Sequence, residues 1–300
     1  MAAVLGFIGL GRMGLPMTRH LAAAGNAVHV FDTAPAALAA ARAFAGVQAE
    51  ASPKAVAAAC DVLFTCLPNN PIVEETYGGA EGIAAGARPG LITGDCSTIS
   101  PEVAERTGQV MRQAGGVHMD TPMLGSQPQA ESGEIFFIVS GEQDAYARIE
   151  GYLGLMGKQS MFVGAGGTAN KIKLIHNALG AINAVAVAET LSLCVDNGVD
   201  LQAFYDVVRS GGGMAFSTYF DRRVARIIEG DYSPTFTVDL MRKDVSLAME
   251  LAGDKGRLLE IMGSAKAAYD AAVDGGWGGE DFSGVSHVIE QRLRLKLSGH

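Results

Sequence analysis

The chain has few cysteines, and they form no pattern that binds metal or suggests disulfides. Four occur in 300 residues, with no CxxC pair and no cysteine–histidine cluster. Scattered thiols of this kind are typical of reduced side chains in a cytosol, and they exclude a zinc site of the usual spacing. We therefore expect a cytoplasmic protein without a metal. The four are Cys60, Cys66, Cys96 and Cys194.

Charged residues are also scarce, at 18% of the chain, and acidic side chains outnumber basic ones to give a net charge of −9. A negative protein is poorly suited to a phosphate backbone, so nucleic acid is not expected as a partner. Charge blocks, internal repeats and low-complexity tails are absent from the sequence. The hydrophobic content of 48% predicts a folded globular protein.

Uninterrupted apolar segments long enough for a membrane are missing as well. The apolar start of the chain lacks the basic region and cleavage pattern of a secretion signal, and it runs directly into a glycine motif. The longest apolar run, from Ala178 to Val195, is interrupted by Asn183, Glu189 and Ser192. This pattern favours a buried helix over a membrane span. No membrane partner is expected.

The N-terminal region reads as a strand, a glycine-rich turn and a helix. An apolar run from Ala3 to Gly9 predicts a strand buried on both faces. The turn that follows is Gly9-Leu10-Gly11-Arg12-Met13-Gly14, a GxGxxG motif. Its first glycine shapes the turn, its second admits a pyrophosphate and its third lets helix pack on strand. A glycine turn without a ligand is the alternative, but the βαβ context favours a dinucleotide site.

The second predicted strand runs from Ala27 to Phe31 and ends at Asp32, which bears on the choice of dinucleotide. A carboxylate there accepts a hydrogen bond from a ribose 2′-hydroxyl and repels a 2′-phosphate. We therefore predict NAD as the cofactor, with NADP as the alternative. In a second interpretation Asp32 caps the next turn, because Thr33-Ala34-Pro35 starts another helix.

Further βα units follow, and their loops supply candidate cofactor contacts. Ligands of open α/β sheets bind at the carboxyl ends of the strands. Leu67, Pro68 and Thr98 follow predicted strands and are placed to contact the nicotinamide half, although Thr98 could equally be a simple turn residue. The strands are expected at 61–67, 91–95, 117–120, 135–140 and 161–163.

The sequence after Gly167 shows only helical periods. The predicted fold is thus an α/β Rossmann domain, with a doubly wound and mostly parallel sheet, plus an all-α C-terminal domain. We expect the first domain at 1–165 and the second at 166–300, joined by a long helix at 168–197.

That long helix carries Lys173 and Asn177 four residues apart, on one helical face. Small residues such as Ala181 and Ala184 follow, which suggests one wall of a site that admits a flat ligand. Lys171 points elsewhere and is expected to be a solvated charge.

These features together resemble the β-hydroxyacid dehydrogenases of the 3-hydroxyisobutyrate dehydrogenase type, from end to end of the chain. The resemblance implies hydride transfer between NAD(P) and C3 of a small 3-hydroxy acid, and a helical domain that forms a homodimer or homotetramer. The matching stretches are Gly6 to Gly14, Asp120 to Gly133, Gly167 to Asn177, Lys243 to Ala248 and Asp281-Phe282-Ser283.

The resemblance also implies roles for single residues. Lys173 matches the catalytic general acid/base and Asn177 its partner. A base is needed because hydride leaves the carbinol carbon only as the hydroxyl proton is drawn off. Thr98 and Lys243 match cofactor contacts, and Phe236 and Asp244 match positions that line the substrate site.

One motif departs from the family pattern. The usual Ser-Gly-Gly, which holds the substrate carboxylate, here reads Leu124-Gly125-Ser126. We expect Ser126 and the nearby amides to bind the carboxylate instead. Ala169 also replaces a common glycine, a milder change.

Three alternatives remain open at the level of sequence. They are an NADPH-dependent glyoxylate or succinic semialdehyde reductase, a dehydrogenase of a 3-hydroxy amino acid such as serine or threonine, and a non-enzymatic relative. The last is expected to lack the lysine and to carry extra basic segments, whereas Lys173 is present here.

Overall fold

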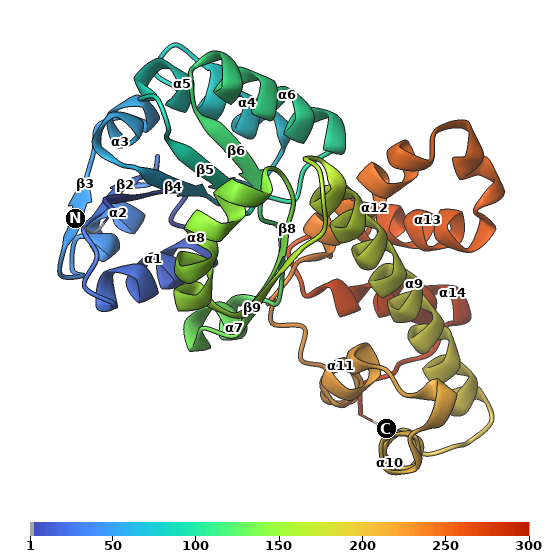
Figure 1. The fold of residues 1–300 in the computed structure, drawn as a ribbon. Coiled ribbons are helices and arrows are strands. Elements are labelled where there is room, and N and C mark those ends of the chain that lie inside the picture. The colour runs from blue at the N-terminus through green and yellow to red at the C-terminus, as the bar shows by residue number, and fades with distance from the viewer. Residues whose placement is uncertain (1–2, 300) are drawn as a thin grey trace. The chain divides into compact units, whose positions relative to one another are not determined.

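The computed structural model describes residues 3–299, and the chain divides into two compact units (Figure 1). Unit 1 comprises Met1–Lys173 and unit 2 comprises Leu174–His300. The division falls inside the long helix, whereas the sequence predicts the domain boundary at residue 165, before that helix. The first turns of the helix belong to unit 1 because hydrogen bonds hold them there, as described below.

Unit 1 is built on a six-stranded sheet in which every pair of neighbours is parallel, with strand order β3-β2-β1-β4-β5-β6. The order reverses between β1 and β4, which is the switch point where such sheets bind ligands. Every residue of β1, β4 and β5 is buried, because helices cover both faces. The strands are β1 (Leu5–Ile8), β2 (Val28–Phe31), β3 (Val47–Ala49), β4 (Val62–Thr65), β5 (Ile92–Asp95) and β6 (Val117–Asp120).

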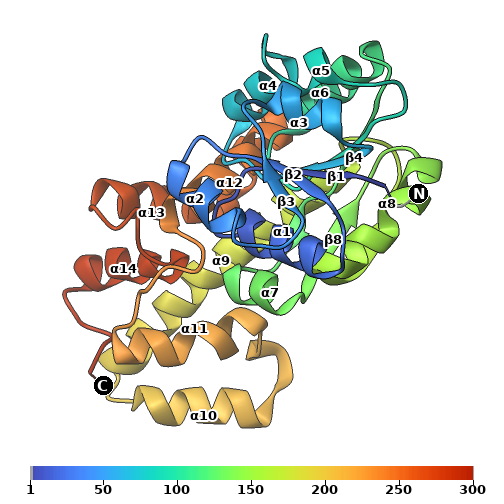
Figure 2. The same cartoon turned by 90° about the vertical axis from the view of Figure 1, so that its left-hand side faces the viewer.

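Two hydrophobic cores lie on opposite faces of this sheet (Figures 1 and 2). One face is covered by α1 (Gly14–Ala23), α2 (Pro35–Ala41) and α8 (Gln143–Met156), the other by α3 (Pro53–Ala59), α4 (Asn70–Gly78), α5 (Ile83–Gly86) and α6 (Pro101–Gln113). Ser52 and Ser100 cap α3 and α6, as the Ser-Pro starts of these helices predict.

A second, three-stranded sheet in unit 1 differs from the prediction of a single sheet. It contains β7 (Met123–Leu124), β8 (Ile135–Val139) and β9 (Gly157–Phe162), with β7 antiparallel and β9 parallel to β8. Leu124 is therefore in a strand, followed by α7 (Gln127–Ser132). The strand β9 is longer than the predicted 161–163, and β3 was not predicted at all. The strand β3 has three residues and half of the six residues in β9 are exposed, so neither shows the continuous apolar run of the buried strands.

Unit 2 is helical, as predicted. Within its described residues the β contact is an isolated bridge between Thr237 and Asp281. The helix α9 (Thr168–Asp196) matches the predicted 168–197 to within one residue. The others are α10 (Leu201–Gly211), η1 (Gly213–Ala215), α11 (Thr218–Glu229), α12 (Val238–Ala252), η2 (Gly253–Leu258), α13 (Glu260–Asp274), η3 (Phe282–Val285) and α14 (Ser286–Leu293).

The small residues of α9 belong to the hydrophobic core of unit 2. Ala181 and Ala184 are fully buried and pack in one cluster with Val238, Met241 and Tyr269. Their interpretation as the wall of a ligand site is therefore wrong. Alanines were needed at these positions because α12 and α13 lie close to α9.

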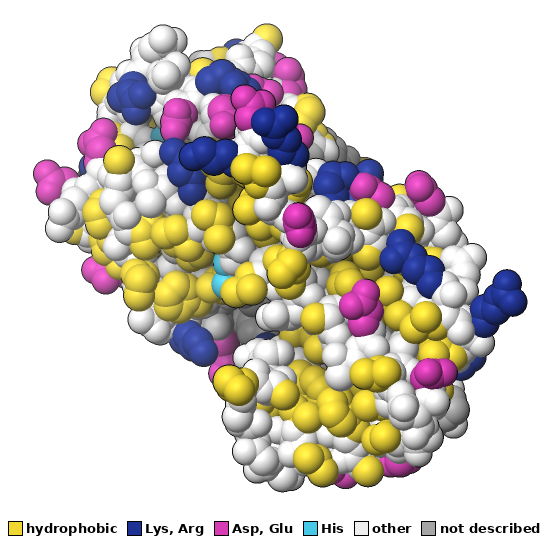
Figure 3. Space-filling model, turned by 90° about the vertical axis from the view of Figure 1, so that its right-hand side faces the viewer, with side chains coloured by type: hydrophobic (Ala, Val, Ile, Leu, Met, Phe, Trp, Pro, Cys, Tyr) yellow, Lys and Arg dark blue, Asp and Glu magenta, His cyan; other side chains and the backbone are white. Residues whose placement is uncertain are grey.

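The opposite face of α9 is apolar and exposed. Ile175, Leu179 and Leu193 are 57%, 58% and 64% accessible. By length and composition α9 would suffice to cross a membrane, with a mean hydropathy of 1.7, and 39% of its most apolar window is buried in the chain. Figure 3 shows exposed hydrophobic side chains on several parts of one face of the molecule, its lower part among them. An exposed apolar face of this kind marks an interaction surface.

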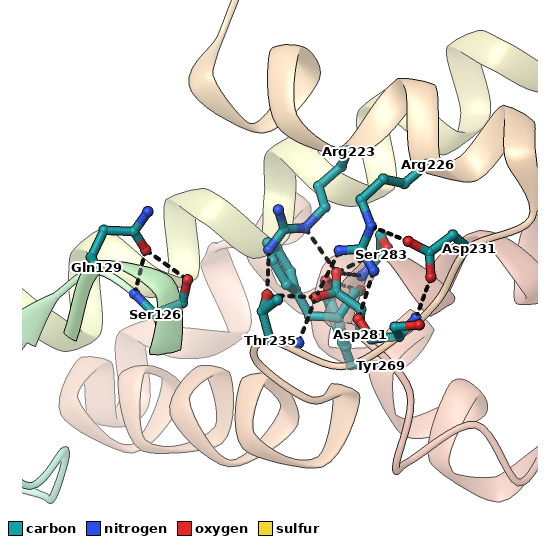
Figure 4. A network of polar contacts seen from close by, with 11 residues as sticks. Ser126, Gln129, Arg223, Arg226, Asp231, Thr235, Tyr269, Asp281 and Ser283 are labelled. Carbon is teal, nitrogen blue, oxygen red and sulfur yellow. Dashed lines mark hydrogen bonds and ion pairs between the residues drawn. The ribbon is translucent and has the colours of Figure 1, made fainter. Parts of the chain in front are cut away.

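A buried carboxylate holds the C-terminal part of unit 2 together (Figure 4). Asp281 is fully buried and accepts hydrogen bonds from Arg223 Nε at 2.8 Å, Thr235 Oγ1 at 2.9 Å and Ser283 Oγ at 3.0 Å. It thereby joins α11, the loop before α12 and η3. The Asp-Phe-Ser motif has a structural role of its own, since a buried carboxylate is stable only when paired.

Candidate active site

The glycine turn after β1 is shaped by close backbone contacts. Gly9 has φ +91°, and a Cβ there would lie 2.3 Å from the carbonyl oxygen of Cys66. A Cβ on Gly14 would lie 1.9 Å from the carbonyl oxygen of Gly9. Both distances are far inside van der Waals contact, so neither position accepts a side chain. These two glycines make the turn and the helix packing that the motif predicts.

Gly11 is different, because a Cβ there would meet no described atom within 4 Å. The space above the turn is open. Met13, the N-cap of α1, makes no side-chain cap hydrogen bond to the helix within residues 3–299. Open space beside a helix N-terminus suits a pyrophosphate. The residues present therefore fit a dinucleotide.

Asp32 lies at the end of β2, beside the turn. Its Oδ2 accepts a hydrogen bond from Leu10 N at 2.6 Å, and its Oδ1 accepts one from Ala34 N at 2.7 Å. The hydrogen bond from Ala34 N shows that Asp32 caps the turn before α2, which is the second interpretation that the sequence offers. Because each carboxylate oxygen has two acceptor sites, capacity for a ribose hydroxyl remains.

The loops after β4 and β5 lie side by side at the same edge of the sheet. Leu67 N donates to Ser97 Oγ at 2.8 Å, and Thr98 follows directly. Ile99 N donates to Asn170 Oδ1 at 3.4 Å, which joins the β5 loop to the first turn of α9. The predicted cofactor loops are thus held to each other within unit 1.

Asp120 anchors the start of α9. Its Oδ2 accepts hydrogen bonds from Gly167 N at 2.5 Å and from Ser140 Oγ at 2.7 Å, and Ser140 Oγ also accepts from Ala169 N at 3.0 Å. A carboxylate at a helix N-terminus is stabilised by the helix dipole. Lys173 follows in the next turn and is buried, with 8% of its surface accessible.

These anchors were missed in the sequence, where Asp120 is a polar residue at the end of a strand with no visible partner. Burial by itself would raise the pKa of Asp120, but His118 at 3.5 Å, the Ser140 hydroxyl and the Gly167 amide together lower it below its ordinary value. The charged form is therefore favoured in the folded protein.

We expect Asp120→Asn to lower the free energy of unfolding by about 2 kcal/mol at pH 7. A lowered folded pKa contributes stability that is present above the unfolded pKa, about 4, and is lost as pH falls through the folded value. The difference between wild type and variant should therefore shrink from pH 5 towards pH 3. Urea unfolding at several pH values measures it, and a difference that grows on acidification would contradict the assignment.

Unit 2 brings together three residues of the predicted site. Asn177 Nδ2 donates to Asp244 Oδ2 at 2.6 Å, and Lys243 Nζ lies 3.2 Å from Asp244 Oδ1. Asp244 is 1% exposed, and Asn177 Oδ1 pairs with His176 Nδ1 at 3.1 Å. The amide of Asn177 is thus held from both ends, and His176 acts on its orientation. Phe236 packs in the same unit, with its ring 6.0 Å from that of Phe282.

Ser126 is engaged by its own helix. As N-cap of α7 it donates from both Oγ and the backbone N to Gln129 Oε1, at 2.8 and 2.9 Å (Figure 4). Gly125 beside it is exposed, with φ +134°. A substrate carboxylate can take the two donors of Ser126 only if it replaces the amide oxygen of Gln129. Leu124 brings no hydrogen-bonding group to this place.

Comparison with known proteins places these features in a family. Residues 4–167 match the NAD-binding domain of 6-phosphogluconate dehydrogenase, and residues 167–289 match the NAD-binding domain of NADP-dependent 3-hydroxyisobutyrate dehydrogenase. L-threonate dehydrogenase of Cupriavidus necator is 34% identical over 96% of this chain and 97% of its own length. The chain belongs to the β-hydroxyacid dehydrogenase family.

Other members of the family are similar along the whole chain. The 2-(hydroxymethyl)glutarate dehydrogenase of Eubacterium barkeri is 32% identical, over 98% of this chain and 97% of its own. A solved structure of 3-hydroxyisobutyrate dehydrogenase from Mycobacterium tuberculosis with L-serine is 29% identical, with a TM-score of 0.84 over 96% of this chain and 99% of that one.

Membership confirms the predicted enzyme class and cofactor type. This β-hydroxyacid dehydrogenase is an oxidoreductase that uses NAD or NADP and acts on a hydroxy acid. The alternative of a non-enzymatic relative is thereby removed.

Proposed function

We propose that this enzyme transfers hydride between NAD and the β-carbon of a small β-hydroxy carboxylate, with Lys173 as general acid/base. The compounds named for its relatives support this choice. 3-Hydroxyisobutyrate, L-threonate, 2-(hydroxymethyl)glutarate and L-serine all carry a hydroxyl on the carbon β to a carboxylate. An alcohol at that carbon is the group they share.

The observation that carries the proposal is the buried Lys173, one helical turn from an Asn177 whose amide is held by Asp244. In its neutral form the amine of Lys173 can accept the proton of a substrate hydroxyl. Asn177 does not titrate, so it can orient the substrate without competing for that proton. When bound, the dinucleotide supplies the hydride acceptor.

Gly125 and Ser126 are proposed to bind the substrate carboxylate. Lys243 and Thr98 are proposed to contact the cofactor. Phe236 and Asp244 are proposed to line the substrate site. The family resemblance implies a serine hydroxyl at position 124, and the leucine here does not supply one. This favours a substrate with an apolar group near its carboxylate.

A second candidate is an NADPH-dependent glyoxylate or succinic semialdehyde reductase, because Leu124-Gly125-Ser126 partly resembles that branch. A screen at 340 nm decides between the two. It pairs NAD and NADP with 3-hydroxyisobutyrate, threonate, serine and 2-(hydroxymethyl)glutarate, and NADH and NADPH with glyoxylate and succinic semialdehyde. Oxidation of a β-hydroxy acid with NAD supports the proposal, and activity confined to the reductions with NADPH would replace it.

We expect Asp32→Ala to relax the preference for NAD over NADP by about fivefold or more, as the ratio of kcat/KM values. The reason is that the carboxylate repels a 2′-phosphate, and one unit charge close to a phosphate changes binding by 1 kcal/mol or more. Asp61→Ala, an exposed acid paired with Arg88 at 3.2 Å, is a control that should leave the ratio unchanged. A wild type that already prefers NADPH would contradict this role of Asp32.

We also propose that the enzyme is a cytoplasmic homodimer. The four cysteines are free thiols, which suits a reducing compartment. The exposed apolar face of α9 offers a surface for a second copy. Light scattering after size exclusion tests the dimer, and Leu179→Glu should shift its mass towards the monomer.

A further inference from the structure

Asp95, the last residue of β5, is a buried carboxyl group that lies beside both cofactor loops without belonging to either. It is fully buried. Its Oδ1 accepts three hydrogen bonds, from Thr65 Oγ1 at 2.7 Å, Ser97 N at 3.0 Å and Ser97 Oγ at 2.5 Å. Its Oδ2 accepts none from the residues that the structure describes. Burial raises the pKa of Asp95, which the Ser97 bonds oppose.

Ser97 passes this interaction on to the neighbouring loop. Its hydroxyl donates to Asp95 and accepts from Leu67 N at 2.8 Å. The two loops are 30 residues apart in sequence, and this hydroxyl joins the backbone of one to the strand end of the other. Leu67 leads to Pro68 and Ser97 leads to Thr98, so this hydroxyl ties together the two segments that carry the predicted nicotinamide contacts.

A carboxyl group is a costly way to stabilise a strand end. Burying it costs several kcal/mol unless it is fully paired, and an apolar residue of similar size would incur no such cost. Among the described residues Oδ2 of Asp95 has no hydrogen-bond partner. The three hydrogen bonds to Oδ1 all come from the end of β4 and from the loop after β5. The arrangement therefore serves the geometry of the carboxyl ends of β4 and β5, next to the switch point between β1 and β4.

We propose that Asp95 and Ser97 act together as positioning residues for the nicotinamide half of the cofactor, by fixing the β4 loop against the β5 loop. The proposal rests on the proposed function, in which Leu67, Pro68 and Thr98 contact that half. Neither residue is catalytic, since each acts through the loops.

The decisive variant is Ser97→Ala, which removes the hydroxyl that accepts from Leu67 N. Calorimetric titration with NADH and with ADP-ribose separates the two halves of the cofactor, because ADP-ribose lacks the nicotinamide. We expect NADH to bind about tenfold more weakly, the effect of one lost hydrogen bond. ADP-ribose should bind within about twofold of wild type, because Asp32 and the glycine turn are unchanged.

Two further variants separate positioning from general stability. Asp95→Asn keeps an acceptor oxygen at the place of Oδ1, so it should retain NADH affinity within about threefold, while Asp95→Ala should resemble Ser97→Ala. Tyr77→Phe is the matched control. The Tyr77 hydroxyl lies 3.0 Å from Thr65 Oγ1 in the same buried cluster, and it is not a partner in the hydrogen bonds that join Asp95, Ser97 and Leu67. It should affect both ligands less than about twofold.

Two results would overturn the proposal: unchanged NADH affinity in a folded Ser97→Ala, or equal weakening of NADH and ADP-ribose. Equal weakening would mean that Ser97 supports unit 1 as a whole. Failure of the proposed function would give a different result. The wild-type protein would then bind NADH more tightly than ADP-ribose but would oxidise no β-hydroxy acid.

Discussion

Lys173→Ala is expected to reduce kcat about a thousandfold, while NADH affinity changes less than about threefold. The proton of the substrate hydroxyl must leave as hydride departs, and in the variant only water can take it. The lysine is proposed to act on the substrate and not on the cofactor, so binding of NADH should survive. Single-turnover rates at saturating substrate, together with calorimetric titration of NADH, measure the two quantities separately.

Lys171→Ala is the matched control for this substitution. Lys171 lies two residues earlier in α9, its side chain is 44% exposed, and it pairs with Glu105 at 3.5 Å. Exposed ion pairs contribute little, so this variant should keep kcat within about twofold. A kcat near wild type in Lys173→Ala, or an equal loss in both variants, would remove Lys173 from the mechanism.

Gly11→Val is expected to weaken the binding of both NADH and ADP-ribose by at least about a hundredfold without changing stability. The position has open space around it, and its backbone does not adopt a left-handed conformation, so the folded protein alone tolerates a side chain. A pyrophosphate on the amides of α1 would need that same space. The midpoint of thermal unfolding should stay within about 2 °C of wild type.

Gly154→Val controls for the general effect of adding a side chain. Gly154 lies in α8, and a Cβ there likewise meets nothing within 4 Å. No change in either affinity is expected. If Gly11→Val bound both ligands normally, the pyrophosphate could not lie over the glycine turn. A large loss of stability would instead show that the turn cannot accept a side chain even without a ligand.

Much of this protein follows from local sequence. The βαβ unit around Gly9 is encoded by residues in immediate succession, because turn geometry and helix starts depend on neighbours in the chain. Lys173 and Asn177 share a helical face for the same reason, since helix geometry relates positions four apart. The resemblance to the family, as seen in the sequence, rests on these same local motifs.

The tertiary structure decided which partners the functional residues have. Asp120 accepts a hydrogen bond from Gly167, which is 47 positions away, and Asp244 accepts one from Asn177, which is 67 positions away. Neither pairing can be predicted from the spacing of residues in the sequence. The small residues of α9, which looked like a ligand wall, are core because α12 and α13 pack on them. Local sequence specifies torsion angles and caps, whereas hydrogen bonds between distant segments and the burial of a face depend on how the elements pack.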